Sequence, residues 1–328
     1  MRKFIIVLIV FINVMIFSHN LSMKNKIYID PIKVDLDKYI GTNNGQIFLI
    51  KDIDNLNIER YNIYNEEVTN FFEFFKNFSL PVLVKSNPFS KQPYYTEFLK
   101  VINDKIYIID QIGEKRKLYI FSPKNNEEKT IKIKGEIRYT SFISFDARDN
   151  DIFLINEEGY LYYYNINNGV SKKGNGFPNK NKIMIVNNNV YVIVYDTTFK
   201  YPHISIIKYD FDLNIKNFSN REYSVIETQF DFISENEERE IYSSFIEDYI
   251  KITKFKNYII IMDEKNFYII DTRTDEKGYS KLFKKIPIKE VIDKKVGSIN
   301  NLILDSDEKN IYLINKENYI LYVLSLDI

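Results

Sequence analysis

The chain has 328 residues, 45% of them hydrophobic, and its 45 basic residues balance its 45 acidic residues. This much apolar material can form one large domain or two modest ones, so a disordered chain is excluded. The balanced charge argues against a nucleic-acid partner, which favours a clustered basic face. Cysteine is absent, so the chain has no disulfide, no thiolate metal site and no cysteine-linked lipid.

The first residues are typical of a secretory leader. Met1-Arg2-Lys3 is a short basic segment, and residues 4–17 are apolar except for Asn13. This run is shorter than the roughly 20 residues of a membrane span. We expect a signal peptide at residues 1–22 and an exported domain at residues 23–328, in the periplasm or cell envelope, with no membrane span of its own. The alternative is an uncleaved leader that anchors the chain in the inner membrane.

A two-strand unit begins at each of six places along the chain. In residues 149–169, DNDIFLINEEGYLYYYNINNG, an Asp/Asn turn leads into an apolar strand, a polar turn, a second apolar strand and an Asn-rich stop. The same order recurs in residues 43–65, 103–121, 187–210, 256–271 and 308–327. The spacing is close to the roughly 40–50 residues of a four-stranded antiparallel blade. We therefore predict an all-β fold, a six-bladed β-propeller.

Additional strands flank these units as a blade requires. We expect inner strands at residues 34–40, 96–102, 140–145, 182–186, 250–255 and 298–304, and outer strands at residues 81–85, 130–134, 221–228 and 281–288. The last unit ends with the chain, whereas residues 26–34 form a spare strand at the other end. We therefore expect the N-terminal strand to complete the sixth blade and close the ring.

The apolar runs IFLI, IYII, YIIIM and IYLI do not alternate with polar residues, so both faces of these strands should be covered. Neighbouring blades would cover them in a propeller. A β-sandwich or a pair of smaller β-domains is the alternative fold.

Two of the intervals between units are long, and we expect a short helix inside each. The first is Glu66–Phe78, with Asn65 as its N-cap and apolar residues near one helical face. The second is Ser234–Asp248, which begins with the capping box Ser234–Glu237. Packing on the propeller is one role for these helices, and docking of a partner is the other.

Residues 141–169 and 299–327 carry a resemblance to known repeats. Their order of an inner strand, an Asp-containing turn and two strands of the types IYLI and LYVLSLD resembles NHL-type and TolB-like six-bladed propellers. The resemblance extends over residues 26–328 and implies a fold rather than a function. The chain differs from the NHL pattern in its few glycines, its uneven repeat lengths and its expected helices.

Motifs for catalysis are absent from the sequence. His19 lies in the leader, so a Ser/His/Asp triad would have to use His203, and no G-x-S-x-G elbow accompanies any serine. We expect the acidic pairs in residues 52–54, 146–151 and 305–307 to form Asx turns, although calcium binding is the alternative. We therefore expect no catalytic residue, no metal ligand and no cofactor.

Two long aromatic loops remain as recognition candidates. Residues 86–95 and 196–203 join strands or blades on the face that propellers commonly use for binding, and aromatic side chains suit a partner surface. The candidate binding residues are Phe89, Tyr94, Tyr95, Phe199, Tyr201 and His203, with Lys115 and Arg116 at the rim. We expect an exported, non-catalytic scaffold that recognises a protein or an envelope ligand. The alternatives are a metal-assisted hydrolase or lyase with an axial site, and a structural envelope component that assembles through its helices.

Overall fold

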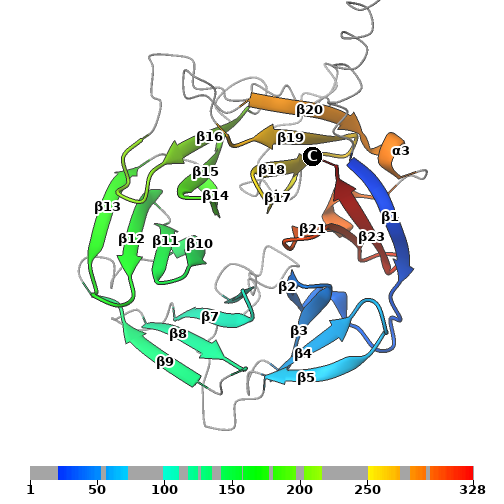
Figure 1. The fold of residues 1–328 in the computed structure, drawn as a ribbon, viewed down its shortest axis with the longest axis horizontal. Coiled ribbons are helices and arrows are strands. Elements are labelled where there is room, and N and C mark those ends of the chain that lie inside the picture. The colour runs from blue at the N-terminus through cyan, green and yellow to red at the C-terminus, as the bar shows by residue number, and fades with distance from the viewer. Residues whose placement is uncertain are drawn as a thin grey trace, which may run out of the picture.

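The computed structural model describes residues 21–327, apart from 53–56, 73–98, 111–116, 125–126, 135–141, 157, 177–179, 197–202, 216–249, 274–280 and 293–295. The described strands form six separate antiparallel sheets around a central axis (Figure 1). The six-bladed propeller is confirmed, and the sandwich and two-domain alternatives are wrong.

Within each blade the strands follow one another from the axis outward. Blade 1 contains β2 (Tyr39–Asn43), β3 (Gln46–Asp52), β4 (Asn57–Asn62) and β5 (Val68–Phe72). Blade 2 contains β6 (Leu99–Ile102), β7 (Lys105–Asp110), β8 (Lys117–Ser122) and β9 (Glu127–Lys132). Blade 3 contains β10 (Phe142–Arg148), β11 (Asp151–Asn156), β12 (Tyr160–Asn165) and β13 (Ser171–Gly176).

The second half of the chain repeats this order. The described strands of blade 4 are β14 (Lys180–Val186), β15 (Asn189–Asp196) and β16 (His203–Tyr209). Blade 5 contains β17 (Lys251–Phe255), β18 (Tyr258–Met262), β19 (Asn266–Asp271) and β20 (Lys281–Pro287). Blade 6 contains β21 (Leu302–Ser306), β22 (Ile311–Asn315), β23 (Ile320–Leu326) and, from the other end of the chain, β1 (Leu21–Tyr28).

The described helices are short. They are the α-helix α3 (Ile288–Val291) and two 3-10 turns, η1 (Leu36–Lys38) and η4 (Ile299–Asn301). In the part of the chain that the structure describes, no helix is both long enough and apolar enough to span a membrane.

The N-terminal strand closes the ring. β1 pairs antiparallel with β23, from Leu21 opposite Leu326 to Tyr28 opposite Ile320 (Figure 1). Without β1, the apolar strand β23 would be an open sheet edge. β1 starts inside the predicted leader, so cleavage after Ser22 would remove the two residues paired with Leu326 and Ser325.

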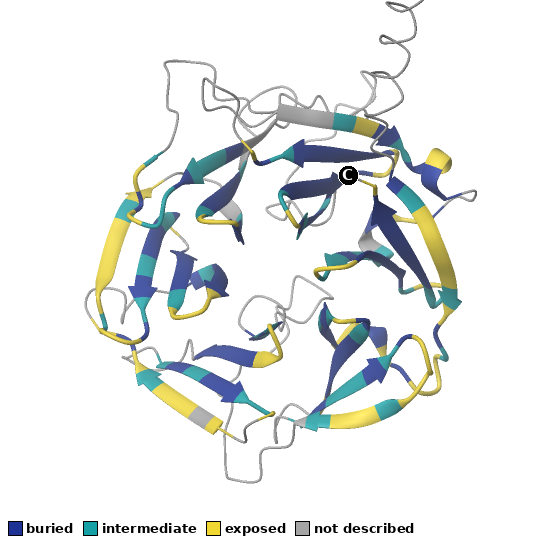
Figure 2. Ribbon diagram, in the orientation of Figure 1, coloured by how far each residue is buried: buried dark blue, intermediate teal, exposed yellow. Residues whose placement is uncertain are grey.

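The described residues form six core clusters, one at each junction between neighbouring blades. Successive side chains of a strand point to opposite faces, so the second strand of each blade contributes side chains to the junctions on both sides of its blade. In β18, Ile260 packs toward blade 6 and Ile259 toward blade 4. In β22, Leu313 packs toward blade 5 and Tyr312 toward blade 1. This arrangement explains the unbroken apolar runs, and Figure 2 shows the buried middle strands inside an exposed outer layer.

The tyrosines of residues 160–164 are part of this packing. Tyr162 and Tyr164 are buried against blade 2, and Tyr163 packs partly buried on the blade 4 side. Their hydrophobic bodies account for the tyrosine run without a ligand.

Asparagine and aspartate have a structural role in the turns between first and second strands. In five blades the first turn residue has a positive φ, at Asn44, Asn103, Asp149, Asn187 and Lys256. Asn and Asp tolerate this left-handed conformation better than most side chains. Four of these five residues are Asn or Asp, which favours tight hairpins at these positions.

The first predicted helix is wrong where the structure describes it. Residues 68–72 form β5, which pairs with β4 as the outer strand of blade 1. The Phe71 ring lies against Phe48 at the junction with blade 2, with 4.7 Å between ring centroids. Residues 68–72 pair with the backbone of β4, and this tertiary pairing prevails over the helical spacing of the apolar residues. The second predicted helix and the outer strands predicted at residues 81–85 and 221–228 lie outside the described residues.

Candidate functional site: the axial channel

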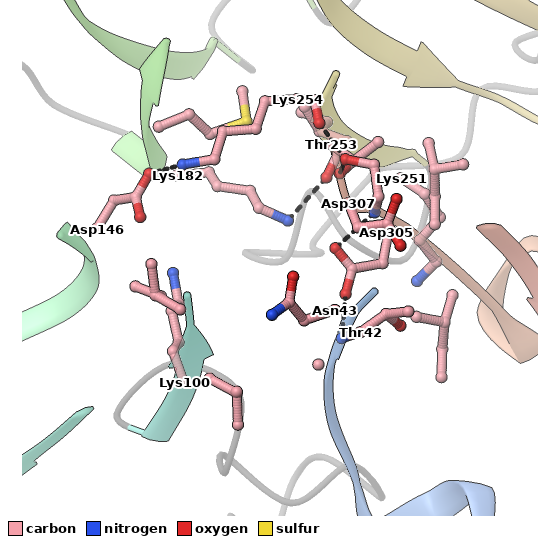
Figure 3. A pocket seen from close by; sticks show the side chains of 18 of the residues that line it. Thr42, Asn43, Lys100, Asp146, Lys182, Lys251, Thr253, Lys254, Asp305 and Asp307 are labelled. Carbon is pink, nitrogen blue, oxygen red and sulfur yellow. Dashed lines mark hydrogen bonds and ion pairs between the residues drawn. The ribbon is translucent and has the colours of Figure 1, made fainter. Parts of the chain in front are cut away.

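The inner strands of all six blades line a cavity along the axis. Its volume is about 690 Å³, and it extends from the turns between first and second strands to residues that precede the inner strands, such as Asp37. Lysine and aspartate side chains project into it from several blades (Figure 3). An axial site is expected from the sequence only for the alternative hydrolase or lyase, and no residues are assigned to it there.

Asp146, on β10 of blade 3, is one of the hydrogen-bonded carboxylates that line this channel. Its Oδ1 accepts from the backbone N–H of Ala147 at 2.9 Å, and its Oδ2 accepts from the N–H of Ile185 on blade 4 at 2.7 Å. The Lys254 ammonium of blade 5 donates to the same Oδ2 at 2.5 Å. The Asp146 carboxylate thus connects three blades.

Asp305 has the corresponding position on β21 of blade 6. Its Oδ1 accepts from the N–H of Ser306 at 2.8 Å, and its Oδ2 accepts from the N–H of Thr42 on blade 1 at 3.0 Å. The Tyr39 hydroxyl also donates to Oδ2. Asp305 is therefore bound by the neutral phenol of Tyr39, whereas Asp146 is bound by the ammonium of Lys254.

Two further lysines donate to carbonyl oxygens of neighbouring blades. The Lys100 ammonium of blade 2 donates to the Phe145 carbonyl of blade 3 at 2.5 Å. The Lys182 ammonium of blade 4 donates to the Ile252 carbonyl of blade 5 at 3.0 Å.

Together with two more contacts, these bonds link all six neighbouring pairs of blades. Asn43 of blade 1 donates from Nδ2 to Asp104 of blade 2 at 2.6 Å. The Ser306 hydroxyl of blade 6 donates to the Lys254 carbonyl of blade 5. The polar inner ring thus complements the apolar junctions outside it.

The two aspartates have opposite pKa shifts. Burial alone would raise the pKa of Asp146, but the charges of Lys254 and Lys100 and the hydrogen bonds from Lys254 and Ile185 hold it below its usual value. Burial raises the pKa of Asp305 above its usual value, despite hydrogen bonds from Tyr39, Ser306 and Thr42 and the charge of Lys182. Burial, and then the charge of Asp305, raises the pKa of the Tyr39 phenol, so Tyr39 remains a proton donor.

The prediction that residues 146–151 and 305–307 form Asx turns is partly wrong. Asp307 does cap its turn, accepting from the N–H groups of Lys309 and Asn310 at 2.7 and 2.9 Å. Asp146 and Asp305 lie within inner strands instead, and they bind residues of other blades. Among the described residues, no group of three or more His, Asp or Glu side chains is arranged to hold a metal ion.

The binding residues predicted from the sequence lie almost entirely outside the described residues. These are Phe89, Tyr94, Tyr95, Lys115, Arg116, Phe199 and Tyr201. His203 is described in its backbone, as the first residue of β16. These residues remain predictions.

We expect Asp146→Asn to lower the free energy of unfolding by roughly 1–3 kcal/mol at neutral pH, because the substitution leaves the Lys254 ammonium without its carboxylate. The folded-state pKa of Asp146 is depressed, so its contribution is present above the unfolded pKa of about 3.9 and is lost as the pH falls through the folded value. Urea unfolding at pH 7 and at acidic pH should therefore show a wild-type advantage that shrinks below about pH 4.

Asp305→Asn is the matched control. The folded-state pKa of Asp305 is raised, so its contribution is present at acidic pH and is lost as the pH rises through the folded value. Because an amide oxygen can still accept from Thr42, we expect little loss at pH 7. Equal losses for the two variants at every pH would contradict the assigned roles.

No family model matches the sequence, and no curated protein matches it. Similar solved structures include BamB from Moraxella catarrhalis, with 10% identity, coverage of 87% of this chain and 68% of that chain, and a TM-score of 0.41. A structural genomics protein of unknown function from Bacteroides thetaiotaomicron has 9% identity, 94% and 76% coverage and a TM-score of 0.46. KlAtg21, in its complex with the coiled-coil of AgAtg16, has 11% identity, 90% and 78% coverage and a TM-score of 0.46. At these identities and TM-scores the likenesses carry no argument about family, activity or partner.

Proposed function

We propose that this chain is an exported, non-catalytic binding propeller of the NHL-like or TolB-like type, which recognises a protein or an envelope ligand through one face of the ring. One observation carries the proposal: Asp146, Asp305, Lys100, Lys182 and Lys254 all bond to other blades. These charged side chains hold the scaffold together inside the ring, so recognition of the protein or envelope ligand is assigned to a face. The basic and apolar leader supports export to the periplasm or cell envelope.

Strand order indicates which face this is. Successive strands are antiparallel, so β7 ends, β8 begins and β6 begins at the same end of the ring. In the sequence, Lys115 and Arg116 fall between β7 and β8, and Phe89, Tyr94 and Tyr95 precede β6, so we assign these residues to that face. Phe199 and Tyr201 fall in the sequence between β15 and β16, the second and third strands of blade 4, and we assign them to the same face.

Capture from envelope extracts tests the face assignment. The test variant carries Phe89→Ser, Tyr94→Ser, Tyr95→Ser, Phe199→Ser and Tyr201→Ser. We expect it to lose at least tenfold of any partner that the wild-type protein retains, because aromatic anchors carry much of the affinity of protein interfaces.

A variant on the opposite face is the control. Glu308→Ser and Lys309→Ser change exposed residues of the turn between β21 and β22. This variant should retain the partner. Equal retention by both variants would contradict the assignment of binding to the aromatic loops.

The alternative of a metal-assisted hydrolase or lyase gains no support from the two channel aspartates. The Asp146 and Asp305 oxygens accept from N–H and O–H donors, as described above, and the two side chains come from opposite blades. The binding role therefore remains the proposed function.

A further inference from the structure

Three ammonium groups and two carboxylates line the axial channel and influence one another's charge. The charges of Lys254 and Lys100 act on Asp146, and the charge of Lys182 acts on Asp305 (Figure 3). These five groups therefore sum to one positive charge when all are ionised. Burial makes Asp305 harder to ionise, which adds to the positive character.

The surroundings of these charges suit a small solute. The cavity volume of about 690 Å³ is within the range of roughly 300–1,000 Å³ that is common for ligand pockets. Val101, Ile143 and Ile183 contribute to the lining, and Ser144, Thr253 and Ser306 add hydroxyl groups to it. Apolar walls lower the local dielectric, so the lysine field acts more strongly here than it would on an open surface.

We propose that the axial channel binds a small solute through its anionic oxygens, with Lys100 and Lys182 as the principal cationic contacts. An ammonium binds carboxylate and phosphate oxygens alike, since it acts as a compact charge with several N–H donors. The two lysines come from blades 2 and 4, on either side of blade 3, which carries Asp146. The negative charge of Asp146 competes with the solute for Lys254 and Lys100.

Calorimetric titration of the full chain with inorganic phosphate and, separately, with succinate tests this site, with sodium chloride adjusted to equal ionic strength. We expect at least one of the two anions to bind. Lys100→Met and Lys182→Met should each weaken that binding by tenfold or more. Asp146→Asn should strengthen it several-fold, because the substitution removes a competing negative charge. Binding of phosphate alone identifies a phosphate-type ligand, and binding of succinate alone identifies a carboxylate.

Lys172→Met is the control for loss of a positive charge. Lys172 is exposed on the outer strand β13 and pairs with Asp212, away from the channel lining. This variant should bind the anion as the wild type does. Failure of both anions to bind at millimolar concentration would overturn the proposal, as would unchanged affinity in both channel-lysine variants. The variant with the five aromatic-to-serine substitutions should still bind the anion. Loss of anion binding can therefore be told apart from loss of the proposed partner recognition.

Discussion

Deletion of residues 1–28 is expected to lower the free energy of unfolding by more than about 3 kcal/mol and to cause self-association. The deletion removes β1, whose Leu21 is buried and whose backbone pairs with β23. β23 reads ILYVLSL, and six of its seven residues are buried. Its exposed edge would then be a long apolar strand, which is the kind of edge that pairs with other chains.

Urea unfolding and size-exclusion chromatography measure the two effects. Deletion of residues 1–20 is the matched control, because it retains the whole of β1. We expect this shorter deletion to be monodisperse and as stable as the full-length chain. If the two deletions behaved alike, β1 would have no role in closing the ring.

Leu313→Ala is expected to lower the free energy of unfolding by roughly 2–5 kcal/mol. Leu313 is fully buried on β22, within the cluster between blades 5 and 6. The substitution removes buried methyl groups and leaves a cavity, because the surrounding strands are held by backbone pairing on both sides of β22 and can collapse little.

Ile32→Ala is the control for this prediction. Ile32 is 93% exposed, so its truncation should change stability by less than about 0.5 kcal/mol. The change in the free energy of unfolding is measured from the urea midpoints of both variants, compared at equal m-values. A small effect at Leu313 would mean that the blade junctions are not the core of the protein.

The repeats could be predicted from the sequence because their evidence is local. Each unit shows a tight turn followed by an apolar run. In the structure, these apolar runs are the second strands of the blades, which contain Ile47, Ile106, Ile152, Val190, Tyr258 and Ile311. Closure of the ring was also predictable, because a spare strand at one end matches a missing strand at the other. The helix predicted at residues 66–78 was wrong for residues 68–72, which form a strand. Their pairing with β4 is a tertiary contact, and the spacing of apolar residues along the chain does not reveal it.

The axial channel could not be predicted in the same way. The roles of Asp146 and Asp305 depend on N–H groups and lysines from other blades, which lie far away in the sequence. One signal was present: FDARDNDIF and LDSDEKNIY carry an aspartate at the same place in the two strongest repeats. Lys100 keeps the same spacing to Ile106 that Asp146 and Asp305 keep to Ile152 and Ile311, but lysines are so common throughout the chain that this position did not stand out.

A disulfide between β1 and β23 tests the closed ring most directly. Ser22 and Ser325 are paired in register, with 3.0 Å between their hydroxyl oxygens, and the chain has no other cysteine to interfere. In the chain expressed from residue 21, Ser22→Cys with Ser325→Cys should oxidise completely to an intramolecular disulfide, seen by mass spectrometry, and should stabilise the fold by roughly 3–5 kcal/mol. Ser22→Cys with Ser306→Cys, two strands further inward, should remain reduced. Absence of the first cross-link, or equal cross-linking in the second pair, would contradict closure of the propeller by its N-terminal strand.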